Sequence, residues 1–253
     1  MARQQSRAVW DKFWAGKDPA EIYPPVTNII EELLNITNLA GKRVLEVGAG
    51  TGRDSLRMFE RGARACILDY SEESLRLVRS RLATDKISCL LADALDAPLP
   101  DNAFDIVFHQ GLLEHFPTPY PLLRENHRVL KTGGLLVVDV PQTFHFYTLM
   151  KHALMLLGIW FGGWERQFTI NSLARLLKNT GFEPVHIYAD WSRPGIVYKI
   201  LRMILQKLRI ALPMYPRYFG SLTKKLYVLQ KRLRRKRLFM YTALSIGIIA
   251  RKK

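Results

Sequence analysis

A glycine-rich turn between an apolar strand and a helix constrains this chain more than any other feature. The segment VLEVGAGTG at 44–52 runs from apolar residues into Gly48, Gly50 and Gly52, and a helix is expected to begin near Arg53. Glycines let the backbone turn sharply and let a ligand approach without a Cβ in the way. A loop of this kind at the carboxyl end of the first strand is where doubly wound sheets bind nucleotides. Taken alone, it is also compatible with a dinucleotide site, a nucleoside site or a tight turn without a ligand.

The spacing of the glycines departs from the dinucleotide-binding pattern. It is G-x-G-x-G instead of G-x-G-x-x-G, and Glu46 stands two residues before the first glycine. An acid at that position is well placed to meet a positively charged group of a ligand.

Strand and helix patterns alternate along most of the chain. The strand candidates are short and apolar without strict alternation, as expected for parallel strands covered on both faces. This order predicts a doubly wound, mostly parallel α/β sheet. Strands are expected at 43–48, 64–69, 87–92, 104–109, 134–140, 182–189 and within 241–253; helices are expected at 5–14, 26–39, 53–62, 72–84, 118–131 and 170–180.

Two acids follow strands of this predicted sheet. Asp69, followed by Tyr70, ends the second strand, where a carboxylate can accept hydrogen bonds from the hydroxyls of a ribose. Its alternative role is to cap the next helix. Asp93 follows the third strand beside Ala94 and could accept a bond from an adenine amino group. Its alternative role is that of a solvated acid in a loop.

Four segments, in order, resemble the class I S-adenosylmethionine-dependent methyltransferases, in the type 11-like group of small-molecule and ubiquinone-biosynthesis enzymes. They are VLEVGAGTG, ILDYS, LLADALDAPLPDNAFDIVFHQGLLEHF and HRVLKTGGLLVVDVP, within residues 43–141. The resemblance implies a Rossmann-like, seven-stranded, mostly parallel sheet with an antiparallel last strand, and S-adenosylmethionine as cofactor. No metal is implied. It also implies these cofactor-binding positions: Glu46, Gly48, Ala49, Gly50 and Gly52 at the amino-acid end, Asp69 with Tyr70 at the ribose, Asp93 with Ala94 at the adenine, and His109 with Gln110 closing the site.

His115, in GLLEHF just past the fourth strand, is the candidate general base. Methyl transfer from a sulfonium is an in-line displacement, in which the protein aligns the reacting atoms and excludes water. A base is needed only where the acceptor atom carries a proton at neutral pH, and histidine suits that role by its ordinary pKa. The alternative is that His115 is structural or orients the substrate. Asp105, in AFDIVF, is expected to be structural.

Basic charge is concentrated at one end of the chain. Residues 191–253 hold 17 of the 38 Lys and Arg and no Asp or Glu, whereas the rest holds 21 against 22 acids. Such a segment seeks phosphates, of lipid head groups or of nucleic acid. Within it, 196–212 has a long apolar face beside basic residues, the pattern of a helix lying in a membrane interface. A second, more basic helix is expected at about 221–239.

The apolar segment 144–164 lies where enzymes of this class carry substrate-facing insertions. Its uninterrupted part, 153–161, is too short to span a bilayer. It is expected to be a lid, either over a small soluble substrate or over a lipid-like one.

These observations define an expected organisation and two competing functions. The chain is expected to hold a helical cap (1–40), a methyltransferase core (41–190) with the lid at 144–164, a basic insert (191–238) and the last core strand (239–253). The first function is methylation of a small, apolar or lipid-linked acceptor at an anionic membrane surface. The second is methylation of RNA gripped by the basic region. A non-enzymatic module is disfavoured by the intact glycine loop.

Compartment and assembly are less constrained. Cys66 and Cys89 give no disulfide framework, and no signal-peptide pattern is present at the N-terminus. A cytoplasmic protein, peripheral on the inner face of the membrane, is expected. The acceptor atom and the oligomeric state stay open.

Overall fold

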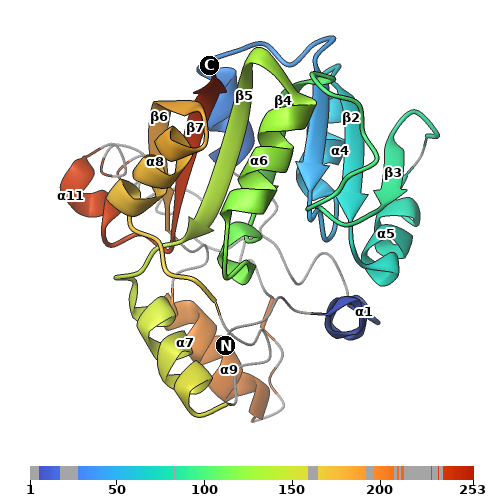
Figure 1. The fold of residues 1–253 in the computed structure, drawn as a ribbon. Coiled ribbons are helices and arrows are strands. Elements are labelled where there is room, and N and C mark those ends of the chain that lie inside the picture. The colour runs from blue at the N-terminus through green and yellow to red at the C-terminus, as the bar shows by residue number, and fades with distance from the viewer. Residues whose placement is uncertain are drawn as a thin grey trace.

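One seven-stranded sheet, in the order β3-β2-β1-β4-β5-β7-β6, organises the protein (Figure 1). The last strand, β7, is antiparallel to both of its neighbours, and the other pairs are parallel. This confirms the predicted fold class. The strands are β1 Arg43–Val47, β2 Arg64–Asp69, β3 Ser88–Leu91, β4 Phe104–Gln110, β5 Leu130–Pro141, β6 Phe182–Asp190 and β7 Ser245–Lys252. The computed structural model describes residues 6–17, 28–82, 84–158, 165–191, 196–207, 210, 212–213, 229, 233 and 236–253.

Helices cover both faces of this sheet. The side chains of α3 and α4 pack on one face, and those of α6 and α8 pack on the other. Helix α5 packs beside β3 and β2, and α1 packs against α5. Helices α7 and α9 lie below the carboxyl ends of the strands (Figure 1). The helices are α1 Arg7–Trp14, α3 Asn28–Leu34, α4 Arg53–Phe59, α5 Glu72–Arg79, the 3₁₀ turn η1 Leu113–His115, α6 Tyr120–Val129, α7 Phe146–Leu156, α8 Ile170–Asn179, α9 Ile196–Lys207 and α11 Arg237–Met240.

The expected elements are present, with local differences. β5 begins four residues earlier than expected, because the chain pairs with β4 at Leu130 and resumes at Leu135 after a bulge. Gly133, at φ 74°, supplies the left-handed residue in that bulge. The turn η1 was not expected from the sequence. Most of the predicted basic helix at 221–239 lies outside the described residues, and the division of the chain into domains stays a prediction.

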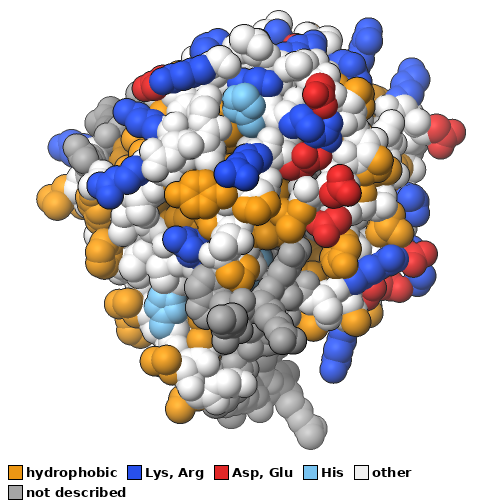
Figure 2. Space-filling model, in the orientation of Figure 1, with side chains coloured by type: hydrophobic (Ala, Val, Ile, Leu, Met, Phe, Trp, Pro, Cys, Tyr) orange, Lys and Arg blue, Asp and Glu red, His pale blue; other side chains and the backbone are white. Residues whose placement is uncertain are grey.

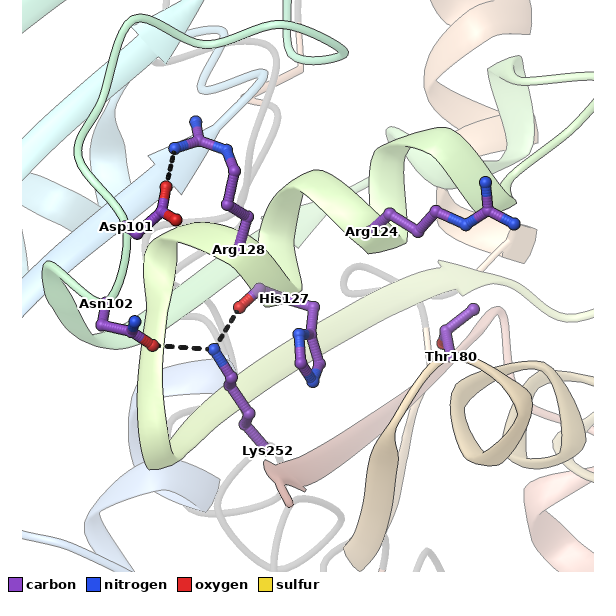
Figure 3. A pocket seen from close by; sticks show the side chains of 7 residues that line it. All are labelled: Asp101, Asn102, Arg124, His127, Arg128, Thr180 and Lys252. Carbon is purple, nitrogen blue, oxygen red and sulfur yellow. Dashed lines mark hydrogen bonds and ion pairs between the residues drawn. The ribbon is translucent and has the colours of Figure 1, made fainter.

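The amino edge of the sheet is closed by Lys252, at the end of β7 (Figure 3). Its Nζ donates to Asn102 Oδ1 at 2.9 Å and to the carbonyls of His127 and Leu130 at 2.7 Å each. These three bonds use all three ammonium protons. Lys252, Asn102 and His127 line a surface pocket of about 440 Å³. Because its lysine is committed to the end of α6, this pocket, at the edge opposite the glycine loop, is structural.

Tyr188 in β6 lies across Gly247 in β7. A Cβ built on Gly247 would lie 1.9 Å from the Tyr188 ring carbon Cζ. The glycine therefore lets the ring cross the neighbouring strand, and its buried hydroxyl lies near the side chain of Asp139 in β5. Gln110 at the end of β4 also lies near Asp139, since the two are register partners. The crossing thus connects the far edge of the sheet to the strand ends at its centre.

We expect Gly247→Ala to destabilise the protein strongly. The added methyl overlaps the ring of Tyr188, and overpacking typically costs about 1–3 kcal/mol, occasionally more. Urea unfolding measures the loss, and the double variant Gly247→Ala with Tyr188→Ala should recover part of it. An unchanged urea midpoint for Gly247→Ala would contradict the packing described.

Candidate functional site

The glycine loop joins β1 to α4 through three left-handed residues. Gly48, Gly50 and Gly52 have φ of 64°, 56° and 62°, a region that other residues seldom adopt. The loop is also closely packed, since a Cβ on Gly48 would lie 2.7 Å from Leu112 Cδ1. Glycine is therefore required here by the backbone conformation, and the Leu112 methyl would have to shift to admit a Cβ.

Asp69 ties this loop to the end of β2. Its carboxylate accepts from the backbone N–H of Gly50 at 2.9 Å and from that of Ser71 at 2.8 Å. Ser74 Oγ donates to the Gly50 carbonyl at 2.8 Å, which fixes the loop a second time. Each carboxylate oxygen has two lone pairs, so Asp69 can still accept from ribose hydroxyls. Tyr70 beside it is exposed. The alternative role of Asp69 as a helix cap is filled by Ser71 instead. Ser71 is the N-cap of α5, and its side chain accepts from Ser74 N.

Glu46 points toward α4. Its carboxylate is buried and accepts from the backbone N–H of Ser55 at 3.1 Å, in the first turn of the helix. Burial, with the nearby Asp54, raises the pKa of Glu46 to about 8. A small cavity of about 10 Å³ lies between these groups and Gln110. Ala49, Thr51 and Arg53 also line it.

His109 and Gln110, both predicted to close the site at the end of β4, point to opposite faces of the sheet. Gln110 accepts a bond from Arg53 at 3.2 Å and faces the glycine loop. His109 is fully buried, its ring nitrogens have no hydrogen-bond partner, and burial lowers its pKa to about 3. It alternates with Gln110, so its ring lies on the face covered by α6 and α8, and only its backbone is available to the site.

Asp93 and Ala94 follow β3 as expected. Asp93 Oδ1 accepts from the backbone N–H of Leu95 at 2.9 Å, so this acid shapes its own turn. Ala94 is buried next to it. Asp105, expected to be structural, accepts from Arg43 N and Lys131 Nζ, both at 2.8 Å, at the amino edge of the sheet.

Helix α1 lies across the carboxyl edge near Asp69. Asp11 accepts from Ser71 Oγ at 2.6 Å, and Arg7 pairs with Glu72 at 3.1 Å, both in the start of α5. Trp10 packs edge-on against His115, with ring centroids 4.8 Å apart. This helix therefore joins the ribose-binding edge to the candidate base.

A buried polar layer lies beneath α7, next to His115. Lys151 forms an ion pair with Glu165, and both side chains are buried. The backbone N–H of Arg166 donates to the Glu114 carbonyl at 2.6 Å, which brings this pair to η1. Burial raises the pKa of Glu114 to about 8 and lowers that of His115 to about 4. Sequence analysis missed Glu114, Lys151 and Glu165, because only a long-range contact joins them.

The residues at the glycine loop fit S-adenosylmethionine. Glu46, Asp69 and Asp139 are buried acids at the carboxyl edge, and burial raises the pKa of each. A cationic ligand would compensate for the desolvation of these carboxylates. Among the described residues, no group of three or more His, Cys, Asp or Glu could hold a metal ion.

About half of the chain is similar in sequence to known methyltransferases. Residues 45–138 match the methyltransferase-domain family. The chain is 38% identical over 104 residues to the demethylmenaquinone methyltransferase of Clavibacter sepedonicus, covering 41% of this chain and 42% of that protein. It is 35% identical over 129 residues to the ubiquinone biosynthesis O-methyltransferase of Pseudomonas fluorescens, covering 49% of this chain and 54% of that protein. The match thus spans about half the length of these curated relatives.

The fold is shared with solved structures. The magnesium protoporphyrin IX methyltransferase of Synechocystis, solved with bound SAH, superposes with a TM-score of 0.58 at 16% identity, covering 89% of this chain and 80% of that one.

The raised pKa of Glu46 predicts a pH dependence of stability. A folded-state pKa above the unfolded value means that the folded protein binds the extra proton, so stability is highest below about pH 4.5 and falls as pH rises to about 8. One such proton contributes a slope of at most about 1.4 kcal/mol per pH unit. Glu46→Gln should flatten the slope of the cofactor-free protein, measured by urea unfolding at several pH values. Glu114 and Asp139 act in the same direction, so part of the slope should persist. Identical slopes for variant and wild type would refute the assignment.

Proposed function

We propose that the chain is an S-adenosylmethionine-dependent methyltransferase that methylates a small, apolar or lipid-linked acceptor at the cytoplasmic face of a membrane. The match of residues 45–138 to the methyltransferase-domain family supports the reaction type. The observation that carries the proposal is the pairing of Asp69 with the glycine loop, next to a second polar site beneath α7. The site at Asp69 suits a nucleoside, and the polar site beneath α7 suits the reacting group of an acceptor. Demethylmenaquinone and ubiquinone, which appear in the names of the relatives, are apolar quinones, and we extend that class of acceptor to this chain.

S-adenosylmethionine, when bound, supplies a methyl group made electrophilic by its sulfonium. Asp69 would hold the ribose, Asp93 and Ala94 the adenine, and the loop with Glu46 and Gln110 the amino-acid end. His115 would take a proton from an acceptor hydroxyl, because burial keeps its imidazole neutral. Trp10 covers this imidazole and excludes water from it.

We expect Asp69→Ala to weaken the binding of S-adenosylmethionine. The loss of hydrogen bonds to a charged acceptor costs roughly 1.5–3 kcal/mol, which is about a tenfold to hundredfold change in affinity. Titration calorimetry measures it, and Asp105→Ala at the opposite edge of the sheet is the matched control. Equal affinities for wild type and Asp69→Ala would remove the ribose assignment. Binding of NAD without S-adenosylmethionine affinity would remove the proposed function itself.

The membrane part of the proposal is supported by the outer face of α7. Phe146 is 64% exposed, Leu149 is 52% exposed and Leu156 is 89% exposed, at helical spacings along one side. Figure 2 shows hydrophobic side chains gathered over α7, at the lower left of the molecule. Leu201 and Ile204 of α9 are also about half exposed. Exposed apolar surface of this kind marks a contact with a partner or a membrane.

Charge favours an anionic bilayer as that partner. Residues 191–253 carry 17 Lys and Arg and no acid, and basic residues near an anionic surface gain about 1 kcal/mol each. Apolar insertion and electrostatic attraction together give stable but reversible anchoring. Among the described residues, no helix is long and apolar enough to cross a membrane.

We expect the protein to sediment with anionic vesicles and less well with neutral ones. Phe146→Ser with Leu156→Ser should reduce binding by about tenfold or more, since burial of one large apolar side chain contributes roughly 1.5–3 kcal/mol. Leu34→Ser, which changes an exposed leucine of α3, is the matched control. High salt should also weaken binding, because charges are screened within about 10 Å at 0.1 M.

A second set of variants tests the basic segment. Neutralising the cluster at 231–237, which lies largely outside the described residues, should weaken vesicle binding and leave S-adenosylmethionine affinity unchanged. Indifference to anionic vesicles, together with tight, steeply salt-dependent binding to RNA, would replace the lipid acceptor with RNA.

A further inference from the structure

Helix α7 is inverted relative to an ordinary surface helix. Amphipathic helices normally bury apolar residues and expose polar ones. In α7 the exposed side chains include Phe146, Leu149, Met150 and Leu156. Thr148 and Lys151, one turn apart, are instead 0% and 4% exposed. Burying an ammonium group is costly unless it is paired. The inner face therefore has a role that an apolar core residue could not fill.

The groups facing Lys151 come from other segments and include both charge signs. Glu165 pairs with Lys151 directly. Glu114 and His115 of η1 lie close enough for their pKa values to respond to Lys151 and Glu165. His152, on α7 itself, responds to the same two residues. Burial lowers the pKa of His115 and raises that of Glu114, so both are largely neutral at pH 7 beside the Lys151–Glu165 ion pair.

Several buried polar atoms in this layer have no hydrogen-bond partner. Buried polar atoms are bonded in the great majority of cases, so the unbonded ones in the segments that form this layer are places where water or the polar groups of a ligand would bond. Contacts hold their segments together: the backbone N–H of Thr143 donates to the Phe168 carbonyl at 3.1 Å, and Gln142 pairs with Phe168. The unbonded atoms are Glu114 Oε2, His115 Nδ1, Gln142 Oε1 and Nε2, Thr148 Oγ1 and Gln167 Oε1.

We propose that this layer binds the reacting end of an acceptor with an ionisable ring hydroxyl, and that Lys151 and Glu165 stabilise the two charges that proton transfer creates. The inference rests on the proposed methyl transfer. The O–H bond breaks and its proton goes to the imidazole of His115, which becomes positive beside Glu165. The oxygen becomes negative beside Lys151. The phenolate oxygen then forms a bond to the methyl carbon. The carbon–sulfur bond breaks, and its electron pair stays on sulfur.

The Lys151–Glu165 ion pair suits this chemistry because its two charges are opposite to those of the phenolate and the His115 imidazolium that form beside it. A phenolate and an imidazolium placed against an ammonium and a carboxylate alternate in sign, and such preorganised charges need no rearrangement during the reaction. A structural ion pair has no such relation to the acceptor. The two variants that remove one charge each therefore distinguish the roles.

The test uses 4-nitrophenol, whose ionised form alone absorbs strongly in the visible range. Titration into the protein, with and without S-adenosylhomocysteine, reports both affinity and ionisation state. Lys151→Met should weaken phenolate binding by roughly tenfold to a hundredfold, as expected for one hydrogen bond to a charged group. Lys151→Arg should restore most of it. Glu165→Gln should strengthen phenolate binding, because it removes a nearby negative charge, and should slow methylation of the true acceptor.

Opposite effects of Lys151→Met and Glu165→Gln on phenolate binding would support the proposal. Equal effects, or none, would overturn it, since a structural pair loses the same contact either way. Lys178→Met, which removes an exposed lysine near Glu183, is the matched control. Circular dichroism checks folding, and if Lys151→Met does not fold, the sign of the Glu165→Gln effect decides. Failure of S-adenosylmethionine to bind would remove the methyl transfer instead, while the titration without cofactor still tests the layer.

Discussion

The carboxylate of Asp69 is the constraint on which the site depends. It accepts from the loop after β1 and from the turn after β2, so two strand ends that are distant in sequence become one rigid edge. The left-handed glycines let the loop approach this carboxylate, and Ser74 fixes it from α5. Desolvating an acid here costs free energy, which the two backbone N–H donors offset in part. Ligand binding at this edge therefore starts from a prepared surface.

The elements that the sequence predicted well are those with local causes. The glycine loop, the strand-end acids and the short apolar strands each depend on residues within one segment, and the structure has them close to the expected places. The missed features depend on distant pairs. Lys151 pairs with Glu165 from a different segment of the chain. The ring of Tyr188 fits only because residue 247 in the neighbouring strand is glycine. No periodicity in either partner alone reveals such a contact.

The apolar character of segment 144–164 predicted a lid, and this stays a prediction. Helix α7 within it lies below the carboxyl ends of the strands, but composition could not say which of its sides faces inward. Thr148 and Lys151 are among the few polar residues of α7, and only the structure shows that they are buried on its inner side. The apolar majority then lies outside, where the described part of the protein leaves it exposed.

Helix α1 has a kinetic consequence. It is held at α5 by Asp11 and Arg7 and at η1 by Trp10, and so lies between the nucleoside edge and the candidate base. Under the proposed function, exchange of spent for fresh nucleoside would require these contacts to break, and the frequency of that opening would limit turnover. Evolution could thus tune the throughput of this protein through Asp11, without touching any group that meets the reacting atoms.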